Sequence, residues 1–235
     1  MSEHKNSLGQ PIGFPMQDWT GCEFPSRSEM VGQYCRLEPI DIQLHADDLY
    51  QAYGKDQDQS NWTYLPYGPF ENKADFVTWL EATSLGDDPL FYTVIDLKTN
   101  QAVGVATYLR INPKDGVIEV GHIHFSPLMQ QTPISTEAMY LMMRRVFNEL
   151  GYRRYEWKCD SLNGPSRAAA LRLGFQFEGI FRQLTMYKAR NRDTAWFSIL
   201  DKEWPKLEAT FKSWLDPENF DETGKQRSSL ASFRT

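Results

Sequence analysis

Long apolar segments are missing from this chain of 235 residues. A membrane-spanning helix needs about 20 consecutive apolar residues, and no run here approaches that length. The first ten residues, MSEHKNSLGQ, also lack the apolar core of a secretory signal peptide. We therefore expect no membrane partner.

Cysteine is scarce as well, with Cys22, Cys35 and Cys159 far apart in the sequence. Three cysteines at these positions indicate neither a disulfide framework nor a paired zinc motif. Free thiols suit a reducing compartment, so a cytoplasmic location is expected. His122 and His124 are spaced like a metal pair, but no third ligand is close to them in sequence, and we expect no metal.

Positive charge is in deficit overall, because 25 Lys and Arg face 31 Asp and Glu, for a net charge of −6. Residues 144–192 are the exception, with 11 basic and 4 acidic side chains. An acidic chain with one basic segment does not fit a general nucleic-acid binder. The basic segment predicts a small anionic ligand, and the acidic remainder favours a cationic one.

Hydrophobic residues (41%) and aromatic residues (14%) are abundant enough to build the core of one large domain. We expect that domain at residues 33–215. Residues 1–32 contain three prolines and no periodicity, which predicts an extended arm. Residues 216–235 are polar and are expected to form a flexible tail.

Strand and helix patterns alternate within the domain. Short strand-like segments separated by turns predict an antiparallel meander, and a later strand–helix–strand crossover predicts a mixed sheet covered by helices. This is an α/β (α+β) fold. The expected strands are residues 33–38, 91–97, 102–111, 117–125, 152–159, 175–181 and 194–200, and the expected helices are residues 42–53, 73–85, 134–150, 165–173 and 203–214. Thr132 suits the N-cap of the longest helix.

Two segments carry the signs of chemistry. Residues 123–138 take a strand through a tight turn into a helix N-terminus, where backbone N–H groups and the helix dipole favour an anion. Residues 163–175 open a short helix at a polar strand end and close it with Gly174 and Phe175. Together they resemble the GNAT superfamily of acyl-CoA-dependent N-acetyltransferases.

The resemblance covers about residues 34–200 and rests on spacing. Pro127 and Gln130 stand where the family has its strand-end proline and the Gln or Arg of its loop. Asn163, Ser166, Gly174 and Phe175 match the family's N-x-x-S-x₇-G-F element. Residues 136–138 are similar to the helix start of the Rim-type branch, the ribosomal-protein N-terminal acetyltransferases. The fold implied is a mixed, mostly antiparallel sheet of about seven strands, splayed between strands 4 and 5, with helices on both faces.

The resemblance implies acetyl-CoA as co-substrate. The family's loop glycines are replaced by Pro133, which donates no N–H, and by Ser135. Either the remaining loop amides still hold the pyrophosphate, or acyl-CoA binding is weakened or lost. The residues implied to bind the cofactor are Ile123, Phe125, Gln130, Gln131, Thr132, Ile134, Ser135, Thr136, Asn163, Ser166, Arg167 and Arg172.

Direct acetyl transfer to an amine needs a base and an acid. The tyrosine that many family members use as the acid is replaced by Ala170. Ser166 is the candidate acid, with a helix cap as its alternative role. Glu119 is the first candidate base and His122 the second, with Asp160 also considered. An odd spacing on one strand predicts that Glu119 and His122 face opposite sides.

The acceptor side is expected at the aromatic loop 61–70 and the hairpin near residues 192–196. Trp62, Tyr64 and Tyr67 either stack on the acceptor amine or pack the loop onto the core. The function implied is an N-acetyltransferase acting on a protein N-terminus or on a small amine or amino-acid-like metabolite, as a monomer or homodimer. A catalytically silent acyl-CoA sensor or scaffold is the alternative.

Overall fold

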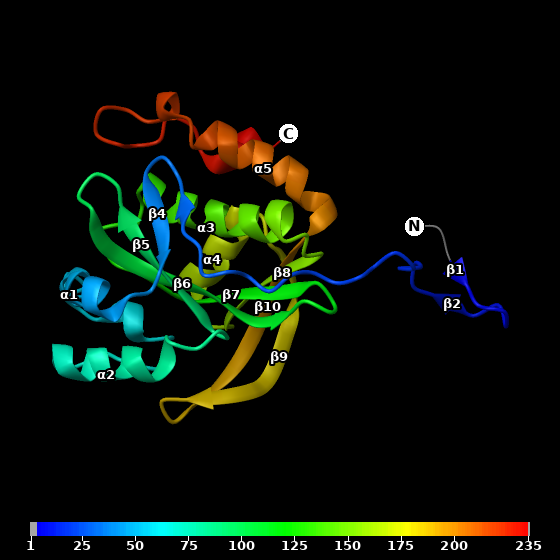
Figure 1. Ribbon diagram of the computed structural model, residues 1–235, viewed down its shortest axis with the longest axis horizontal. Coiled ribbons are helices and arrows are strands. Elements are labelled where there is room, and N and C mark those ends of the chain that lie inside the picture. The colour runs from blue at the N-terminus through cyan, green and yellow to red at the C-terminus, as the bar shows by residue number, and fades with distance from the viewer. Residues whose placement is uncertain (1–3, 235) are drawn as a thin grey trace.

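The computed structural model describes residues 4–234 and is built around one eight-stranded sheet (Figure 1). The strand order is β3-β4-β5-β6-β7-β8-β10-β9, and every neighbouring pair is antiparallel except β7 and β8. The strands are β3 (Met30–Val31), β4 (Cys35–Pro39), β5 (Leu90–Asp96), β6 (Gln101–Asn112), β7 (Val117–Phe125), β8 (Arg154–Asp160), β9 (Gln176–Tyr187) and β10 (Arg190–Leu200). The predicted mixed, mostly antiparallel sheet is confirmed, with β3 as an additional edge strand.

Helices cover both faces of the sheet, as predicted (Figure 1). They are α1 (Ile42–Tyr53), α2 (Lys73–Thr83), α3 (Pro133–Arg144), α4 (Gly164–Leu173) and α5 (Trp204–Trp214). A five-residue π-helical turn extends α3 to Glu149. Helix starts follow their capping residues: the Asp41 carboxylate accepts from two N–H groups of α1, and the Asn72 side chain accepts from one of α2.

Two hydrophobic clusters fill the layers. The larger lies between the sheet and α3, α4 and α5, and its largest buried rings include Tyr108, Tyr155 and Phe197. The smaller lies under α1 and α2, against β5 and β6, around Leu49 and Phe76. Because successive strand residues face opposite sides, β5 and β6 supply both clusters.

Glu137 of α3 anchors the segment that leads into β4. Its carboxylate is 3% exposed and accepts hydrogen bonds from the backbone N–H groups of Gln33, Tyr34 and Cys35 at 2.7, 2.6 and 2.8 Å. A side chain at Gly32 would collide with this carboxylate, so glycine is required there. Glu137 therefore joins the helix to the sheet.

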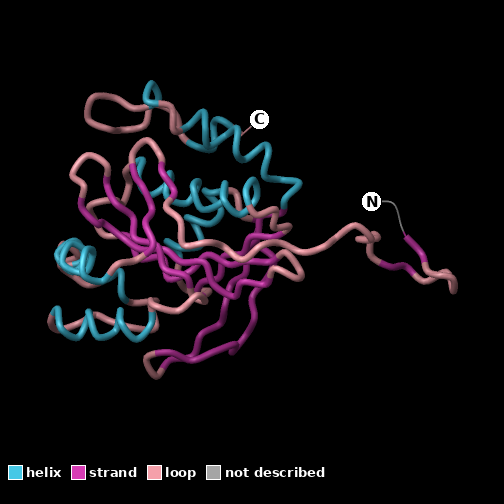
Figure 2. The backbone as a smooth tube through the Cα atoms, in the orientation of Figure 1, coloured by secondary structure: helices cyan, strands magenta, loops and turns pink. Residues whose placement is uncertain are grey.

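The two ends of the chain differ (Figures 1 and 2). Residues 4–18 extend away from the body and include a small hairpin of β1 (His4–Lys5) and β2 (Pro11–Ile12). The arm meets the body at Trp19, whose Nε1 donates to the Lys114 carbonyl at 2.7 Å. Residues 216–234, expected to be a flexible tail, fold back beside α5, where Leu230 is 1% exposed. The boundaries at residues 32/33 and 215/216 remain a proposal. None of the helices in residues 4–234 has the length and hydropathy to cross a membrane.

Candidate active site

β7 and β8 separate partway along their length and open a cleft. They pair only from Val117 opposite Arg154 to Val120 opposite Trp157. Beyond that point β7 continues to Phe125, paired only with β6, and β8 continues to Asp160. A cavity of about 920 Å³ extends from the aromatic loop through this gap to the starts of α3 and α4. The predicted splay, between the two strands expected at residues 117–125 and 152–159, is confirmed.

A β-bulge at His122 reverses the alternation of β7. His122 has φ 45°, and His122 and Ile123 together oppose the single residue Ala106 of β6. Ile118 and Val120 pack into the larger cluster before the bulge, whereas Ile123 and Phe125 pack against it afterwards. One extra residue has therefore exchanged the two faces of the strand.

The bulge brings Glu119 and His122 to the same side of the sheet. The His122 ring contacts Phe91 of the smaller cluster, with centroids 5.3 Å apart, and Glu119 lies opposite in direction to its buried neighbours Ile118 and Val120. The expectation that Glu119 and His122 face opposite sides was wrong, because it assumed uninterrupted alternation.

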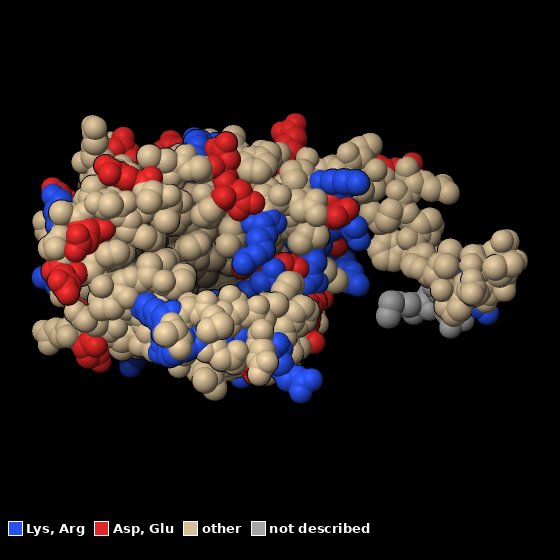
Figure 3. All heavy atoms as spheres, turned by 90° about the horizontal axis from the view of Figure 1, so that it is seen from below, with Lys and Arg blue, Asp and Glu red and all other residues tan. Residues whose placement is uncertain are grey.

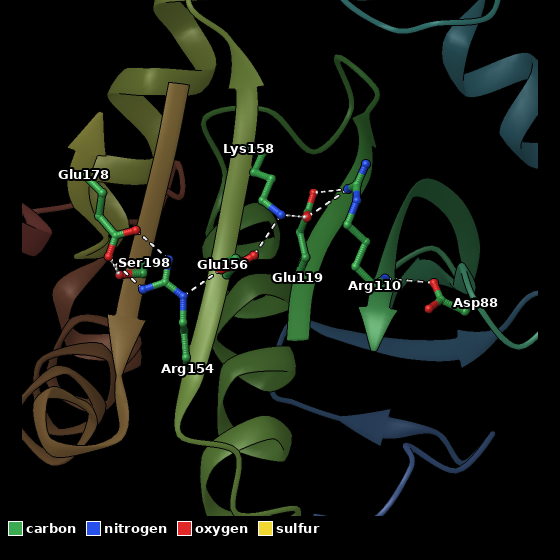
Figure 4. A network of polar contacts seen from close by, with 8 residues as sticks. All are labelled: Asp88, Arg110, Glu119, Arg154, Glu156, Lys158, Glu178 and Ser198. Atoms are coloured by element: carbon green, nitrogen blue, oxygen red, sulfur yellow. Dashed lines mark hydrogen bonds and ion pairs between the residues drawn. The ribbon is translucent and has the colours of Figure 1, made fainter. Parts of the chain in front are cut away.

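Glu119 is oriented by two cations (Figure 4). Nη1 of Arg110 lies 2.8 Å from each carboxylate oxygen, and Nζ of Lys158 lies 2.7 Å from Oε2. Burial raises the pKa of the Glu119 carboxyl above its usual value, and the charges of Lys158 and Arg110 oppose that rise. The result is a fixed carboxylate with increased affinity for a proton.

The ion pairs continue across the sheet from Glu119 (Figure 4). Lys158 also pairs with Glu156 at 2.8 Å, and Arg154 joins Glu156 to Glu178 of β9. The Lys158 ammonium lies 3.7 Å from the ring centroid of Trp196. These contacts hold β7, β8, β10 and β9 together on the face that carries Glu119.

His122 and His124 are neutral at physiological pH. Burial, assisted by the charge of Arg110, lowers the pKa of His122 to about 4, and burial lowers the pKa of His124 to about 3. Nδ1 of His122 lies 3.3 Å from the Tyr67 hydroxyl, and the His124 ring stacks on Tyr53 with centroids 3.8 Å apart. His122 can therefore accept a proton. No group of three or more His, Cys, Asp or Glu suited to a metal occurs within residues 4–234.

The first turn of α3 has no side-chain cap. Thr132 occupies the N-cap position, but its hydroxyl donates to the Met129 carbonyl at 2.8 Å and accepts from no helix N–H group. The predicted capping role of Thr132 is thus only positional. Ser135 and Thr136 line the cavity at this end, and Arg172 donates to the Thr136 hydroxyl at 3.0 Å. Helix N–H groups and a guanidinium meet there, which suits an anion.

The start of α4 assigns separate roles to Asn163 and Ser166. The Asn163 side chain accepts from the Ser166 N–H at 3.0 Å, so Asn163 caps the helix and Ser166 does not. The hydroxyl of Ser166 accepts from Nε1 of Trp157 at 3.0 Å, inside the cavity. Arg167 donates to the Ser161 carbonyl and lies over the Phe177 ring, so it is not part of the cavity lining.

Of the three residues predicted in the aromatic loop, Tyr64 lines the acceptor end of the cleft, whereas Trp62 and Tyr67 do not. Trp62 is 6% exposed and packs in the smaller cluster, and Tyr67 supports His122 from behind. The tip of the β9–β10 hairpin holds the loop in place. Lys188 donates to the Trp62 carbonyl at 2.7 Å, and Arg190 donates to the Thr63 carbonyl at 2.6 Å.

Most of the predicted site residues meet in this one cavity. Those that line it are Tyr64, Glu119, His122, Ile123, Phe125, Gln130, Gln131, Ser135, Thr136, Asn163, Ser166 and Arg172. Thr132, Ile134, Arg167, Trp62 and Tyr67 are not in its lining. Arg110, Trp157 and Lys158 were not among the site residues expected from the sequence, and Arg192 was expected only as part of a hairpin. The signal in the sequence that could have indicated a role for β8 was the alternation of charged residues with Trp157 and Cys159 along this strand.

The chain is similar to known proteins over most of its length. Residues 35–176 match the family model of an acetyltransferase (GNAT) domain. The crystal structure of a GCN5-related N-acetyltransferase from Brucella melitensis is 48% identical, covering 93% of this chain and 99% of that one, with a TM-score of 0.91. A probable acetyltransferase from Chromobacterium violaceum is 41% identical over 83% of this chain and 98% of that one, with a TM-score of 0.77. The uncharacterized N-acetyltransferase p20 of Bacillus licheniformis is 24% identical over 170 residues, 72% of this chain and 95% of that protein.

Proposed function

We propose that this protein transfers an acetyl group from acetyl-CoA to a primary amine. The chain belongs to the GNAT acetyltransferase family and is therefore an acyltransferase. GNAT enzymes use acetyl-CoA. The observation that carries the proposal is the cavity between β7 and β8, because it joins an anion-binding helix start to a carboxylate and a neutral histidine. The acceptor is either a protein N-terminus, as in the Rim-type branch, or a small amine.

The residues around the cleft fit acetyl-CoA. The inner edge of β7 beyond Val120 is not paired with β8, so its backbone is free to pair with the amides of pantetheine. Asn163 lies across the gap from it and also lines the cavity. At the far end, the uncapped first turn of α3 and Arg172 suit the phosphates, in spite of Pro133.

Acetyl-CoA, when bound, supplies the acetyl group as a thioester. Glu119, with its raised pKa, takes the proton that the amine nitrogen loses as it attacks the thioester carbonyl carbon. His122 is the second candidate for this step. Ser166 donates its hydroxyl proton to the thiolate that leaves when the carbon–sulfur bond breaks, and solvent then returns a proton to the serine and removes the one held by Glu119. A backbone N–H near Phe125 polarises the carbonyl oxygen.

Two measurements on the purified protein test the proposal. Acetyl-CoA should raise the melting temperature, since a ligand that binds only the folded state stabilises it. Free thiol should then appear when acetyl-CoA is mixed with a panel of amines and peptides. The absence of any shift at millimolar acetyl-CoA would contradict the proposal.

A matched pair of variants locates the cofactor. Arg172→Gln should reduce the thermal shift caused by acetyl-CoA, whereas Arg167→Gln, which removes the same charge outside the cavity lining, should leave the shift unchanged. A normal shift without thiol release from any amine would favour the silent sensor instead. Many family members have a tyrosine that serves as the general acid where this chain has the fully buried Ala170. This replacement is the observation that favours the silent sensor.

A further inference from the structure

Arg192 of β10 is a cation in the cleft that the proposed reaction leaves unused. It lines the cavity, and its Nε is buried without a hydrogen-bond partner among residues 4–234. The other cations near the proposed base are neutralised, because Arg110 and Lys158 both pair with Glu119. Within the described part of the chain, no Asp or Glu forms an ion pair with Arg192.

The surroundings of Arg192 explain why it has no acidic partner. On the neighbouring strand, Asp160 is 5% exposed and both of its oxygens are occupied, one by the Tyr187 hydroxyl at 2.8 Å and the other by the Leu162 N–H at 2.9 Å. The Tyr187 ring lies under the guanidinium of Arg192, 5.9 Å from its centroid. Tyr187 thus contacts the Arg192 guanidinium through its ring and bonds to the Asp160 carboxylate through its hydroxyl.

Arg192 lies at the acceptor end of the cleft. Two residues before it, Arg190 bonds to the Thr63 carbonyl, and both Thr63 and Tyr64 line the same cavity. The other unpaired cleft arginine, Arg172, contacts Thr136 at the start of α3. Arg172 lies eight residues beyond Gly164, the first residue of α4, which is about 12 Å along the helix axis at about 1.5 Å per residue. The two arginines therefore belong to opposite ends of the cavity.

We propose that Arg192 binds the carboxylate of the acceptor, and hence that the acceptor is an amino-acid-like compound carrying both an amine and a carboxylate. The inference rests on the proposed function. A guanidinium offers paired N–H donors that match the two oxygens of a carboxylate, and partial burial strengthens that contact. With the carboxylate held by Arg192, the amine of the same molecule lies in the cavity that Glu119 and His122 also line.

The charge distribution agrees with an anionic group on the acceptor. Figure 3 shows Lys and Arg side chains gathered beside a hollow and over the β9–β10 hairpin, while Asp and Glu are frequent toward α1 and α2. An incoming molecule meets this local field, although the net charge of the chain is −6. The cationic acceptor that net charge alone favours is therefore replaced by a zwitterionic one.

The experiment compares amino acids with their amides as acceptors for the full-length protein. Each pair differs only in the carboxylate, and kcat/KM is measured for both members with wild type, Arg192→Gln and Arg182→Gln. Arg182 is exposed on the same hairpin and does not line the cavity, so Arg182→Gln removes the same charge outside the cleft. We expect Arg192→Gln to lower the ratio of acid to amide by roughly 10- to 100-fold, as expected for loss of a charged hydrogen bond. Arg182→Gln should leave the ratio close to that of wild type.

Several outcomes would overturn the inference. An unchanged ratio in Arg192→Gln refutes it, as does a raised KM for acetyl-CoA with the ratio intact, which would make Arg192 a cofactor residue. Turnover of peptides but not of amino acids refutes it and leaves the proposed function standing. A wild-type protein that acetylates neither acceptor but is stabilised by acetyl-CoA refutes the acceptor class alone. The absence of stabilisation by acetyl-CoA removes the proposed function and this inference together.

Discussion

The indole Nε1 of Trp157 donates a hydrogen bond of 3.0 Å to the hydroxyl oxygen of Ser166. Because that oxygen accepts from Trp157, the hydroxyl proton of Ser166 is directed elsewhere, and the serine is positioned as a donor. Trp157, Ser166 and Cys159 all line the cavity. Burial raises the pKa of the Cys159 thiol, and the neighbouring Ser166 opposes that rise.

Replacing Ser166 by alanine should lower kcat by about 100-fold, the range of a lost general acid, with little change in the KM for acetyl-CoA. Steady-state thiol release measures both constants. Trp157→Phe is the matched control, because it removes the other half of the same hydrogen bond and leaves the serine in place. A Ser166→Ala rate within about twofold of wild type would show that the serine is structural.

The pH dependence of kcat/KM should identify the base. The acceptor amine is protonated from about pH 4 to about pH 8, so its ionisation gives a slope of one in log(kcat/KM). The raised pKa of Glu119 predicts an additional slope below a break that lies above 4.5, the ordinary value for Glu. Glu119→Gln should abolish the break and slow the reaction by about 100-fold or more. If the break instead lies near 4 and disappears in His122→Asn, His122 is the base.

Acid should destabilise the fold through its buried histidines. Because burial lowers the folded-state pKa of His122 to about 4, the unfolded chain binds the extra proton first as the pH falls below about 6.5. Stability contributed by neutral His122 is therefore present above that pH and is lost toward pH 4, by roughly 3 kcal/mol. Urea unfolding between about pH 7 and about pH 4 measures the loss.

A second buried histidine gives the control for that pH series. His124→Phe keeps a ring against Tyr53 and removes a group that burial holds at a pKa of about 3. The variant should show a shallower loss of stability on acidification than wild type. Identical slopes in the two proteins would mean that His124 does not contribute.

Glu137→Gln should destabilise the protein by about 2–4 kcal/mol, because a buried carboxylate that accepts three backbone N–H groups loses its charge and one acceptor. Chemical denaturation provides the measurement. Glu149→Gln is the control, since that side chain is 48% exposed and pairs only with arginines, so its loss should cost under about 1 kcal/mol. Equal losses in both variants would rule out the anchoring role of Glu137.

Local patterns in the sequence predicted most of the elements, and most of the candidate site residues line one cavity. The helix expected at residues 42–53 and the strand expected at residues 117–125 have the bounds of α1 and β7, because periodicity and turn residues report directly on local backbone. Asn163 and Ser166 lie within one helical turn, where the Asn163 side chain accepts from the Ser166 N–H, and their roles toward acetyl-CoA stay predictions.

What failed depended on contacts between distant segments. The role of Arg167 could not be inferred, because only tertiary packing turns it toward the Ser161 carbonyl while Arg172 reaches α3. The tail was expected to be flexible because it is mostly polar, yet Leu230 is buried and Phe220 and Phe233 pack against the larger cluster. The twelve-residue length of β9 was underestimated because its residues are mostly exposed on both sides and show no alternation.

The bulge at His122 makes the register of one strand a determinant of chemistry. Deleting either His122 or Ile123 would restore one-to-one pairing, with the remaining residue opposite Ala106 and His124 still opposite Val105. The residue opposite Ala106 faces the larger cluster, so the imidazole of His122 would be lost from the side that carries Glu119. The extra residue is therefore what allows a histidine to join Glu119 while the strands on both sides keep their register.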